Sequence, residues 1–326
     1  MLARFRRWAL IGTALGALLY LGLSLYAGLP AVAGELARFA WVWAIPIVAL
    51  SLFNYALRFA KWHYLLRRLG VRIGVAEDAQ IFLAGLAMTI TPGKAGEVLK
   101  PLLVRSAAGA PLTRTVPALV AERGTDALAV LGLAAIGVTH YFAEGVGALL
   151  TVAAVGAVGL AILASERLSL WLIGLTAHVP LISKLRGRLE EMYRAMRICL
   201  APGPLVLIVA LSMVAWGAEA VGYLIILEGF AVENADLSVA TFIYAFSSIA
   251  GAPSPGGLGV ADAAMQEGAM QLIAGITRPQ ALGAALLCRL ATLWLGVAMG
   301  GVVLLRYGAT LGSDADAAPE EQRPAA

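Results

Sequence analysis

Charged residues are scarce in this chain. They make up 13% of its 326 residues, about half of their usual share in soluble domains. No polar stretch is long enough to fold as a separate soluble domain. Hydrophobic residues instead make up 60% of the chain, and its mean hydropathy is +0.84. This composition excludes an ordinary soluble protein and indicates an integral membrane protein.

Residues suited to metal binding or catalysis are also few. The two cysteines, Cys199 and Cys288, are far apart, and the three histidines lack metal-ligand spacing. The sequence contains no glycine-flanked serine elbow, no phosphate-binding P-loop and no zinc-type cysteine set. Ser254 lies between two prolines, but no partner base can be identified for it. We therefore expect no metal, no cofactor, no disulfide and no enzymatic activity.

Six apolar segments are candidates for spanning helices. A helix needs about 20 apolar residues to cross a hydrocarbon core roughly 30 Å thick. The expected spans are 8–29, 39–57, 115–142, 147–163, 204–227 and 280–305. The first is longer than a signal-peptide core, so we interpret it as an uncleaved helix. Tryptophans near span ends are typical of aromatic belts. The fold class is thus an all-α membrane helix bundle.

Basic residues predict the orientation of this bundle. Clusters at 58–72 and 184–197 belong on the cytoplasmic side, and 167–197 has the pattern of a basic amphipathic surface helix. The remaining connections are mostly acidic and belong outside, so both termini are expected in the cytoplasm. Arg58 and Lys61 are expected to snorkel to the cytoplasmic interface, or alternatively to line a lipid path. The net charge of +4 is explained by this topology, and no nucleic-acid partner is expected.

Two segments rich in proline and glycine interrupt the apolar pattern. Residues 91–97 read TPGKAGE and residues 253–259 read PSPGGLG. Non-helical backbone at membrane depth is tolerated only where protein or a water-filled cavity satisfies it, so these breaks predict a ligand site. The topology places the flanks of 76–104 inside and those of 239–273 outside. We therefore predict two oppositely oriented re-entrant helical hairpins in an inverted repeat, on topology alone.

The first break combines flexible backbone with charge. Gly93 and Gly96 allow a tight turn, and Lys94, Glu97 and Lys100 add charge beside it. A helix beginning just after the turn would direct free N–H groups at a phosphate, with Lys94 or Lys100 as counter-charge. The alternative is a cytoplasmic loop whose lysines are solvated.

Charged residues inside expected spans need partners. Glu122 and Asp126 share a helix face, and Arg123 can reach Asp126 three residues away. Such groups normally face the bundle interior, where they would either staple the helices or take part in substrate or proton binding. Both alternatives stay open.

The second half of the chain contains fewer charged residues that could pair with one another or bind a substrate. Arg289 could neutralise Glu219 or Asp262, or contact an anionic head group directly. The candidate binding residues are Gly93, Lys94, Gly96, Glu97, Lys100, Glu122, Arg123, Asp126, Gly256, Gly257, Asp262 and Arg289.

Three ordered blocks resemble a known family. PGKAGEVLKPLL at 92–103, ER followed by D at 122–126, and SPGGLGV followed by D at 254–262 are similar to the lysylphosphatidylglycerol synthase transmembrane region, a flippase-like membrane family. The resemblance covers about residues 10–307, and Asp262 stands where many members carry glutamate. It implies a bacterial or archaeal inner-membrane protein associated with lipid translocation between leaflets. Some members are fused to a soluble aminoacyl-transferase domain, whereas only a short polar stretch follows Tyr307 here, so we do not expect synthase activity.

These observations combine into one functional expectation. A single flippase-like domain at 1–310, followed by a polar cytoplasmic tail at 311–326, is expected to translocate or bind an anionic lipid. A phospholipid or a polyprenyl-phosphate-linked lipid fits, and a homo-oligomer is compatible with the sequence. The alternatives are a membrane-embedded lipid-modifying enzyme and a non-transporting scaffold of an envelope-synthesis complex.

Overall fold

The computed structural model of the chain describes residues 29–91, 96–141, 171 and 186–316. All regular elements in this part are helical, and it contains no strand, which confirms the all-α class. The expected spans at 8–29 and 147–163 lie outside the described residues, as do Gly93, Lys94 and most of 167–185.

Three helical segments of the described part are long and apolar enough to cross a membrane. They are Trp41–Arg68, Pro202–Gly229 and Arg278–Arg306. Their outer faces stay apolar and accessible: Ile45 is 75% exposed and Val206 is 70% exposed. Contact with lipid explains such exposure over long spans.

The same order of elements occurs twice along the chain. The first set is α3 (Ala44–Arg68), α4 (Val75–Leu86), α5 (Leu99–Ala108) and α6 (Leu112–Tyr141). The second set is α11 (Pro202–Gly229), α12 (Leu237–Ala250), α13 (Val260–Leu272) and the continuous run of α14 (Arg278–Arg289), a π-helical turn (Leu290–Trp294) and α15 (Leu295–Asp316). In each set the proline- and glycine-rich break lies between the second and third helices.

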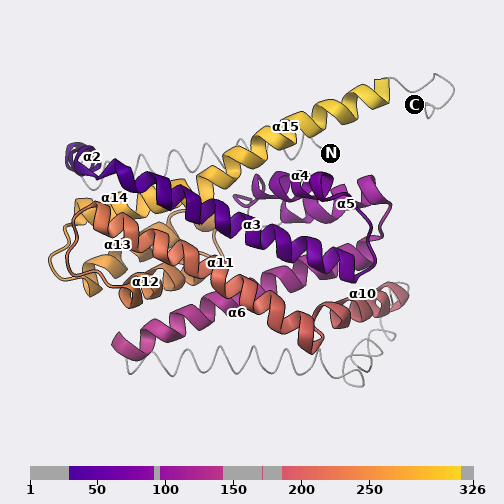
Figure 1. Cartoon of the computed structure of the whole chain (residues 1–326), viewed down its shortest axis with the longest axis horizontal. Helices are drawn as coiled ribbons and strands as arrows, with labels where there is room; N and C mark the ends of the chain where they lie inside the picture. Colours follow the sequence, from indigo (N-terminus) through magenta and orange to yellow (C-terminus); the bar gives the residue numbers. More distant parts are fainter. Residues whose placement is uncertain (1–28, 92–95, 142–170, 172–185, 317–326) are drawn as a thin grey trace.

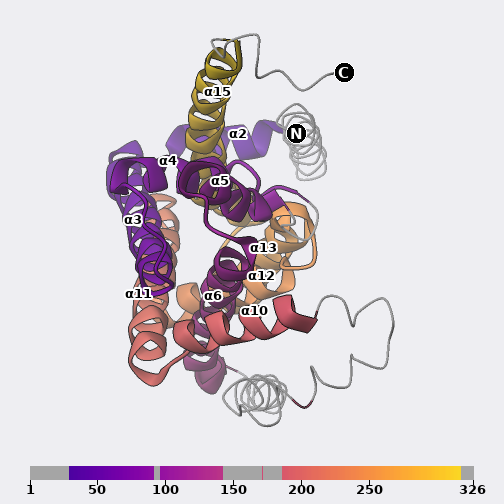
Figure 2. The same cartoon turned by 90° about the vertical axis from the view of Figure 1, so that its right-hand side faces the viewer.

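The two sets pack across one another. α3 lies along α11, while α6 packs against α12 and α15 packs against α4 (Figure 1). The last long helix of each set therefore covers the short helix of the other. Figure 2 shows α6 between the α3–α11 pair and the α12–α13 pair. Two further helices, α2 (Leu29–Arg38) and α10 (Arg186–Cys199), pack against α14 and α6.

Local sequence signals account for several helix ends. The Asp236 carboxylate accepts a hydrogen bond from the Val239 N–H at 2.8 Å and begins α12. Thr277 and Gln280 form a reciprocal capping box at the start of α14. Gly109, with φ +63°, ends α5 in the left-handed conformation.

Two helix limits differ from the sequence predictions. We expected the second span to end at residue 57, where a basic cluster begins, but α3 continues to Arg68. The expected boundary was wrong because Arg58 and Lys61 are buried inside the bundle instead of marking a loop. The last helix also runs to Asp316, into the segment expected to be a polar tail.

The first break is held by a threonine. The Thr91 hydroxyl donates to the Met88 carbonyl at 2.7 Å and accepts from the Gly96 N–H at 2.8 Å, so it joins the two sides of the break. Residues 96–98 then form a 3₁₀ turn that leads into α5.

The second break depends on glycine backbone. Gly256, Gly257 and Gly259 have φ values of +59°, +76° and +80°, which side-chain-bearing residues rarely adopt. A Cβ atom placed on Gly256 would lie 3.2 Å from the Cα of Ile90. The two breaks are therefore in direct contact, and only glycine leaves room for that approach.

Candidate functional site

Lys61 is the most deeply enclosed cation of the described chain. Its side chain on α3 is fully buried, and Nζ lies 2.5 Å from Asp126 Oδ1 on α6. The ammonium also donates to Ser212 Oγ on α11 at 2.7 Å and to the Glu122 carbonyl at 3.1 Å. The expectation that Lys61 snorkels to the interface was wrong, because these oxygens replace its hydration inside the bundle.

Arg58 belongs to the same interior cluster. Its Nε lies 3.9 Å from Asp126 Oδ2, and its guanidinium carbon lies 5.9 Å from the centre of the Trp216 ring. Snorkelling is therefore wrong for Arg58 as well. The signal that could have revealed this is the spacing of Asn54, Arg58 and Lys61, which places three polar side chains on one face of α3.

Lys100 is neutralised by a buried carboxylate. Its Nζ lies 2.5 Å from Glu122 Oε2 and 4.3 Å from the centre of the Trp62 ring. A Cβ atom on Gly85 would lie 2.5 Å from Lys100 Cγ, so the glycine on α4 makes room for the lysine stem. Trp62, which also lies near the end of an expected span, is fully buried under this lysine, so an aromatic belt does not explain it.

A second buried pairing lies behind Trp62. The Asp78 carboxylate accepts from Trp62 Nε1 at 2.9 Å and lies 2.6 Å from His63 Nδ1. Burial raises the pKa of Asp78, while the contacts with His63 and Trp62 oppose that rise. These residues fix the packing of α3 on α4.

Arg123 joins the first break to α6. Its Nη2 lies 2.5 Å from Glu122 Oε1, its Nε lies 3.1 Å from Glu97 Oε2, and its Nη1 lies 3.5 Å from Asp126 Oδ2. The predicted Arg123–Asp126 pair is confirmed. With 24% of its side chain exposed, Arg123 is also the most accessible member of the cluster.

Arg289 joins the second break to α14. Its Nε lies 3.3 Å from Asp262 Oδ1, and its Nη2 donates to the carbonyl of Gly256. Asp262 in turn accepts from the Gly259 N–H at 2.8 Å. Of the two partners considered for Arg289, Asp262 is the one that pairs with it. Glu219 accepts a hydrogen bond from the Tyr244 hydroxyl.

The two arginine–carboxylate pairs correspond in sequence as well as in space. Glu97 and Arg123 are 26 residues apart, and Asp262 and Arg289 are 27 residues apart. In both pairs the carboxylate lies at or just after the C-terminal end of a break, and the arginine lies on the next long helix.

A small polar cavity lies where the two halves meet. It has a volume of about 90 Å³ and is lined by Arg58, Arg123, Arg289, Glu219, Tyr244, Thr89, Gly256 and Gly257 among others. Three guanidinium groups from α3, α6 and α14 therefore surround one space. Guanidinium groups bind phosphate and carboxylate well because several N–H donors are fixed in a plane.

A larger groove adjoins this cavity between α6 and α12. Its volume is about 650 Å³; its apolar lining includes Leu119, Val130, Leu131 and Ile249, and its charged lining consists of Glu97, Arg123 and Asp126. Arg123, Trp216, Ser248 and Ala252 line both the groove and the cavity. A largely apolar groove therefore shares a polar border with the cavity.

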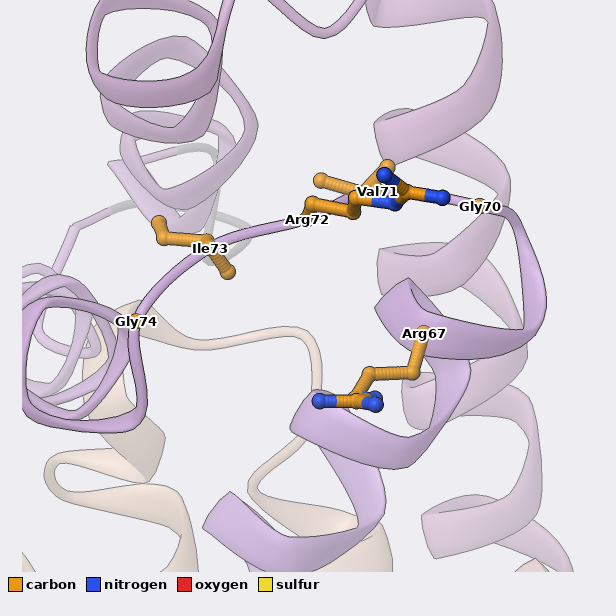
Figure 3. Close-up of a pocket in the computed structure, with 6 residues that line it drawn as sticks. All are labelled: Arg67, Gly70, Val71, Arg72, Ile73 and Gly74. Carbon is orange, nitrogen blue, oxygen red and sulfur yellow. The ribbon is translucent and has the colours of Figure 1, made fainter.

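A third hollow lies at the loop between α3 and α4. It has a volume of about 620 Å³ and is lined by Arg67, Arg72 and the loop 70–74. Figure 3 shows the loop arching from Gly70 to Gly74 with Arg67 beneath it. Both arginines are exposed, and the hollow shares no lining residue with the cavity or the groove.

The described candidate residues form two neighbouring groups around the breaks. The first contains Gly96, Glu97, Lys100, Glu122, Arg123 and Asp126, and the second contains Gly256, Gly257, Asp262 and Arg289. Glu122 and Lys100 bind each other and do not line the cavity. Trp62, Ser212, Trp216 and Tyr244 were missed as members of this region, and for Arg58 and Lys61 a place in the interior was only the alternative to snorkelling. Within the described ranges, no group of three or more His, Cys, Asp or Glu residues is arranged to hold a metal ion.

The family model of the lysylphosphatidylglycerol synthase TM region matches residues 10–300. The match covers most of the chain, so the protein belongs to this family, as its three sequence blocks predicted. No curated protein and no solved structure matches the chain. Membership identifies a membrane protein that is tied to the handling of anionic lipids.

Proposed function

We propose that this protein binds an anionic lipid and moves it between the leaflets of the inner membrane, with the head group in the cavity between the two breaks. The observation that carries this proposal is the cavity lined by Arg58, Arg123 and Arg289. A lipid phosphate needs fixed donors to replace its hydration inside a membrane protein. Each guanidinium carries five N–H donors, and the carboxylates beside Arg58, Arg123 and Arg289 accept only some of them. Binding and movement of an anion require only these donors, so the activity that we propose is non-enzymatic.

The topology that we propose makes the cavity reachable from both sides. Each break would belong to a re-entrant hairpin, one entering from the cytoplasm and the other from outside, within an inverted repeat. The repeated order of helices, the two matching ion pairs and the contact between Ile90 and Gly256 support this arrangement. The basic clusters favour a cytoplasmic location for both termini.

The scaffold alternative also has support in the structure. The charges of Lys61, Lys100, Glu122 and Asp126 are joined in ion pairs, as expected for a cluster that only holds helices together. Such a protein would need these residues for folding and would move no lipid.

Transport in reconstituted vesicles separates these functions. We would measure the transbilayer movement of fluorescent phosphatidylglycerol, with fluorescent phosphatidylcholine as the zwitterionic comparison. Arg123→Gln should slow phosphatidylglycerol movement about tenfold or more, the loss expected for one charge-assisted hydrogen bond. Arg114→Gln is the matched control, because Arg114 is also on α6 but half-exposed, 3.6 Å from Glu191.

Thermal stability in detergent completes the test. Slow transport by a stable Arg123→Gln protein supports head-group binding in the cavity. Normal transport by that variant would overturn the assignment of the cavity. A stable wild-type protein that moves neither lipid would favour the scaffold.

A further inference from the structure

We infer that the apolar chain of the lipid lies in the groove between α6 and α12, and that Trp216 donates a hydrogen bond to the oxygen that links chain and head group. This inference rests on the proposed function, and it assigns a sideways entry from the bilayer to the substrate. The ligand class is a lipid with a phosphoester or ester oxygen next to its apolar chain.

The composition of the groove suits such an amphiphile. Leu119, Val130, Leu131 and Ile249 provide apolar walls, and Arg123 lies where the groove borders the cavity. A lipid in the groove would place its chain against the apolar walls and its head group beside the guanidinium that also lines the cavity. A water-soluble anion would gain nothing from those walls, because their contribution comes from burial of apolar surface.

Trp216 stands at the junction and has an unused donor. Its Nε1 is buried and has no hydrogen-bond partner among the described residues. A buried N–H without a partner is disfavoured by the cost of its desolvation. Trp216 lines both the groove and the cavity, and we expect a ligand oxygen at their junction to come within reach of this donor. The same ring packs beside Tyr244 at 6.3 Å and faces Arg58, which fixes its orientation.

Gly124 carries no side chain into the groove on the side of α6. Gly124 lines the groove, and a Cβ atom placed there would meet nothing within 4 Å. A larger side chain at this position would therefore begin in open space, and we expect it to extend into the groove. The substitution Gly124→Leu is accordingly a specific obstacle to a lipid chain.

Fluorescence quenching can test the position of the chain. Phosphatidylglycerol carrying bromine on its acyl chains would be added to the protein in nanodiscs, and tryptophan fluorescence would be measured. The contribution of Trp216 is the part of the fluorescence that is absent in the Trp216→Phe variant. We expect Gly124→Leu to remove this quenching and Gly301→Leu to leave it unchanged. Gly301 is the matched control because its Cβ direction on α15 is also open. Glycerol phosphate, a soluble head group, should not compete with the brominated lipid.

Transport measurements separate the inference from the function on which it rests. Trp216→Phe should slow phosphatidylglycerol movement about tenfold or less, as expected for one neutral hydrogen bond, and Tyr223→Phe should not. Tyr223 has a buried hydroxyl without a partner in the described part, but it lines neither hollow. One outcome would overturn the groove and keep the proposed function: Gly124→Leu shows the same fluorescence quenching and transport as the wild type, while Arg123→Gln does not transport. Another would keep the groove as a binding site and overturn transport: neither the wild type nor the variants move lipid, but the quenching is lost in Gly124→Leu.

A second variant that narrows the groove covers the case in which Gly124→Leu does not fold. Ala127 is an exposed residue of the same groove wall on α6. If Gly124→Leu is unstable, Ala127→Leu should give the same loss of quenching. Unchanged quenching in a folded Ala127→Leu protein would overturn the inference.

Discussion

The two breaks of this protein are held in place by different means. Around the first, Arg58, Lys61, Lys100 and Arg123 meet Glu97, Glu122 and Asp126 in a nearly continuous buried network. Around the second, the described residues show the pair of Arg289 and Asp262 together with three glycines of positive φ. A break at the same place in the order of helices can therefore be stabilised either by charged side chains or by the backbone conformation of glycines.

This difference has an energetic consequence. A buried ion pair contributes little net stability, because desolvation of both charges offsets their attraction, but removal of one partner leaves the other uncompensated. The first half should therefore be sensitive to the loss of single charges. The second half should be sensitive to changes of its glycines.

The largest expected effect is that of Asp126→Asn. Lys61 is fully buried, and Asp126 is the carboxylate with which it pairs. The variant leaves a buried ammonium without its counter-charge, and we expect a loss of about 3–5 kcal/mol in the free energy of unfolding. Denaturant titration in detergent would measure it.

Two further variants sharpen this comparison of the halves. Lys61→Met combined with Asp126→Asn should recover much of the loss, since no unpaired cation remains at position 61. Asp262→Asn should cost less than Asp126→Asn, because Arg289 keeps its hydrogen bond to Gly256 and is 14% exposed. Equal losses in Asp126→Asn and Asp262→Asn would contradict the difference that we describe.

The next effect concerns the backbone of the second break. Gly256→Ala forces a side chain into a left-handed conformation and toward the Ile90 backbone. We expect a loss of about 1–3 kcal/mol, the usual range for such strain. The same denaturant titration checks it, with Gly74→Ala as control, since Gly74 has an extended backbone and open space at its Cβ. A neutral Gly256→Ala would mean that the two breaks separate easily.

Much of this arrangement could be predicted from sequence. The apolar composition predicted a helical membrane protein, and proline with glycine marked both breaks. Spacing alone predicted the Arg123–Asp126 pair, because residues three apart meet on a helix. For Arg289 the sequence left pairing with Glu219, pairing with Asp262 and direct contact with a head group open, and the structure shows the pair with Asp262.

The missed residues share a physical reason. Lys61 and Arg58 resemble ordinary cytoplasmic flanking residues until Asp126, 65 residues after Lys61, is placed beside them. Trp216 lies in an apolar run whose periodicity gives no sign of a cavity, since its significance depends on Ser248 and Arg123 of other helices. Long-range contacts of this kind are set by packing, which local pattern does not record.

The smallest expected effect tests whether the long helices of the two halves behave alike despite their different breaks. Gly124 on α6 and Gly301 on α15 both lie inside helices and have open space at their Cβ positions. Replacement by alanine should stabilise each helix by about 0.5–1 kcal/mol, because glycine loses more backbone entropy on folding. Thermal unfolding in detergent would compare the two variants.

Gains in stability of similar size would mean that the two halves differ only in their breaks, because the helices that cover the breaks would respond in the same way. A loss of stability in Gly124→Ala alone would instead show that α6 needs the glycine for a close contact, and the groove would then be narrower than its lining residues indicate.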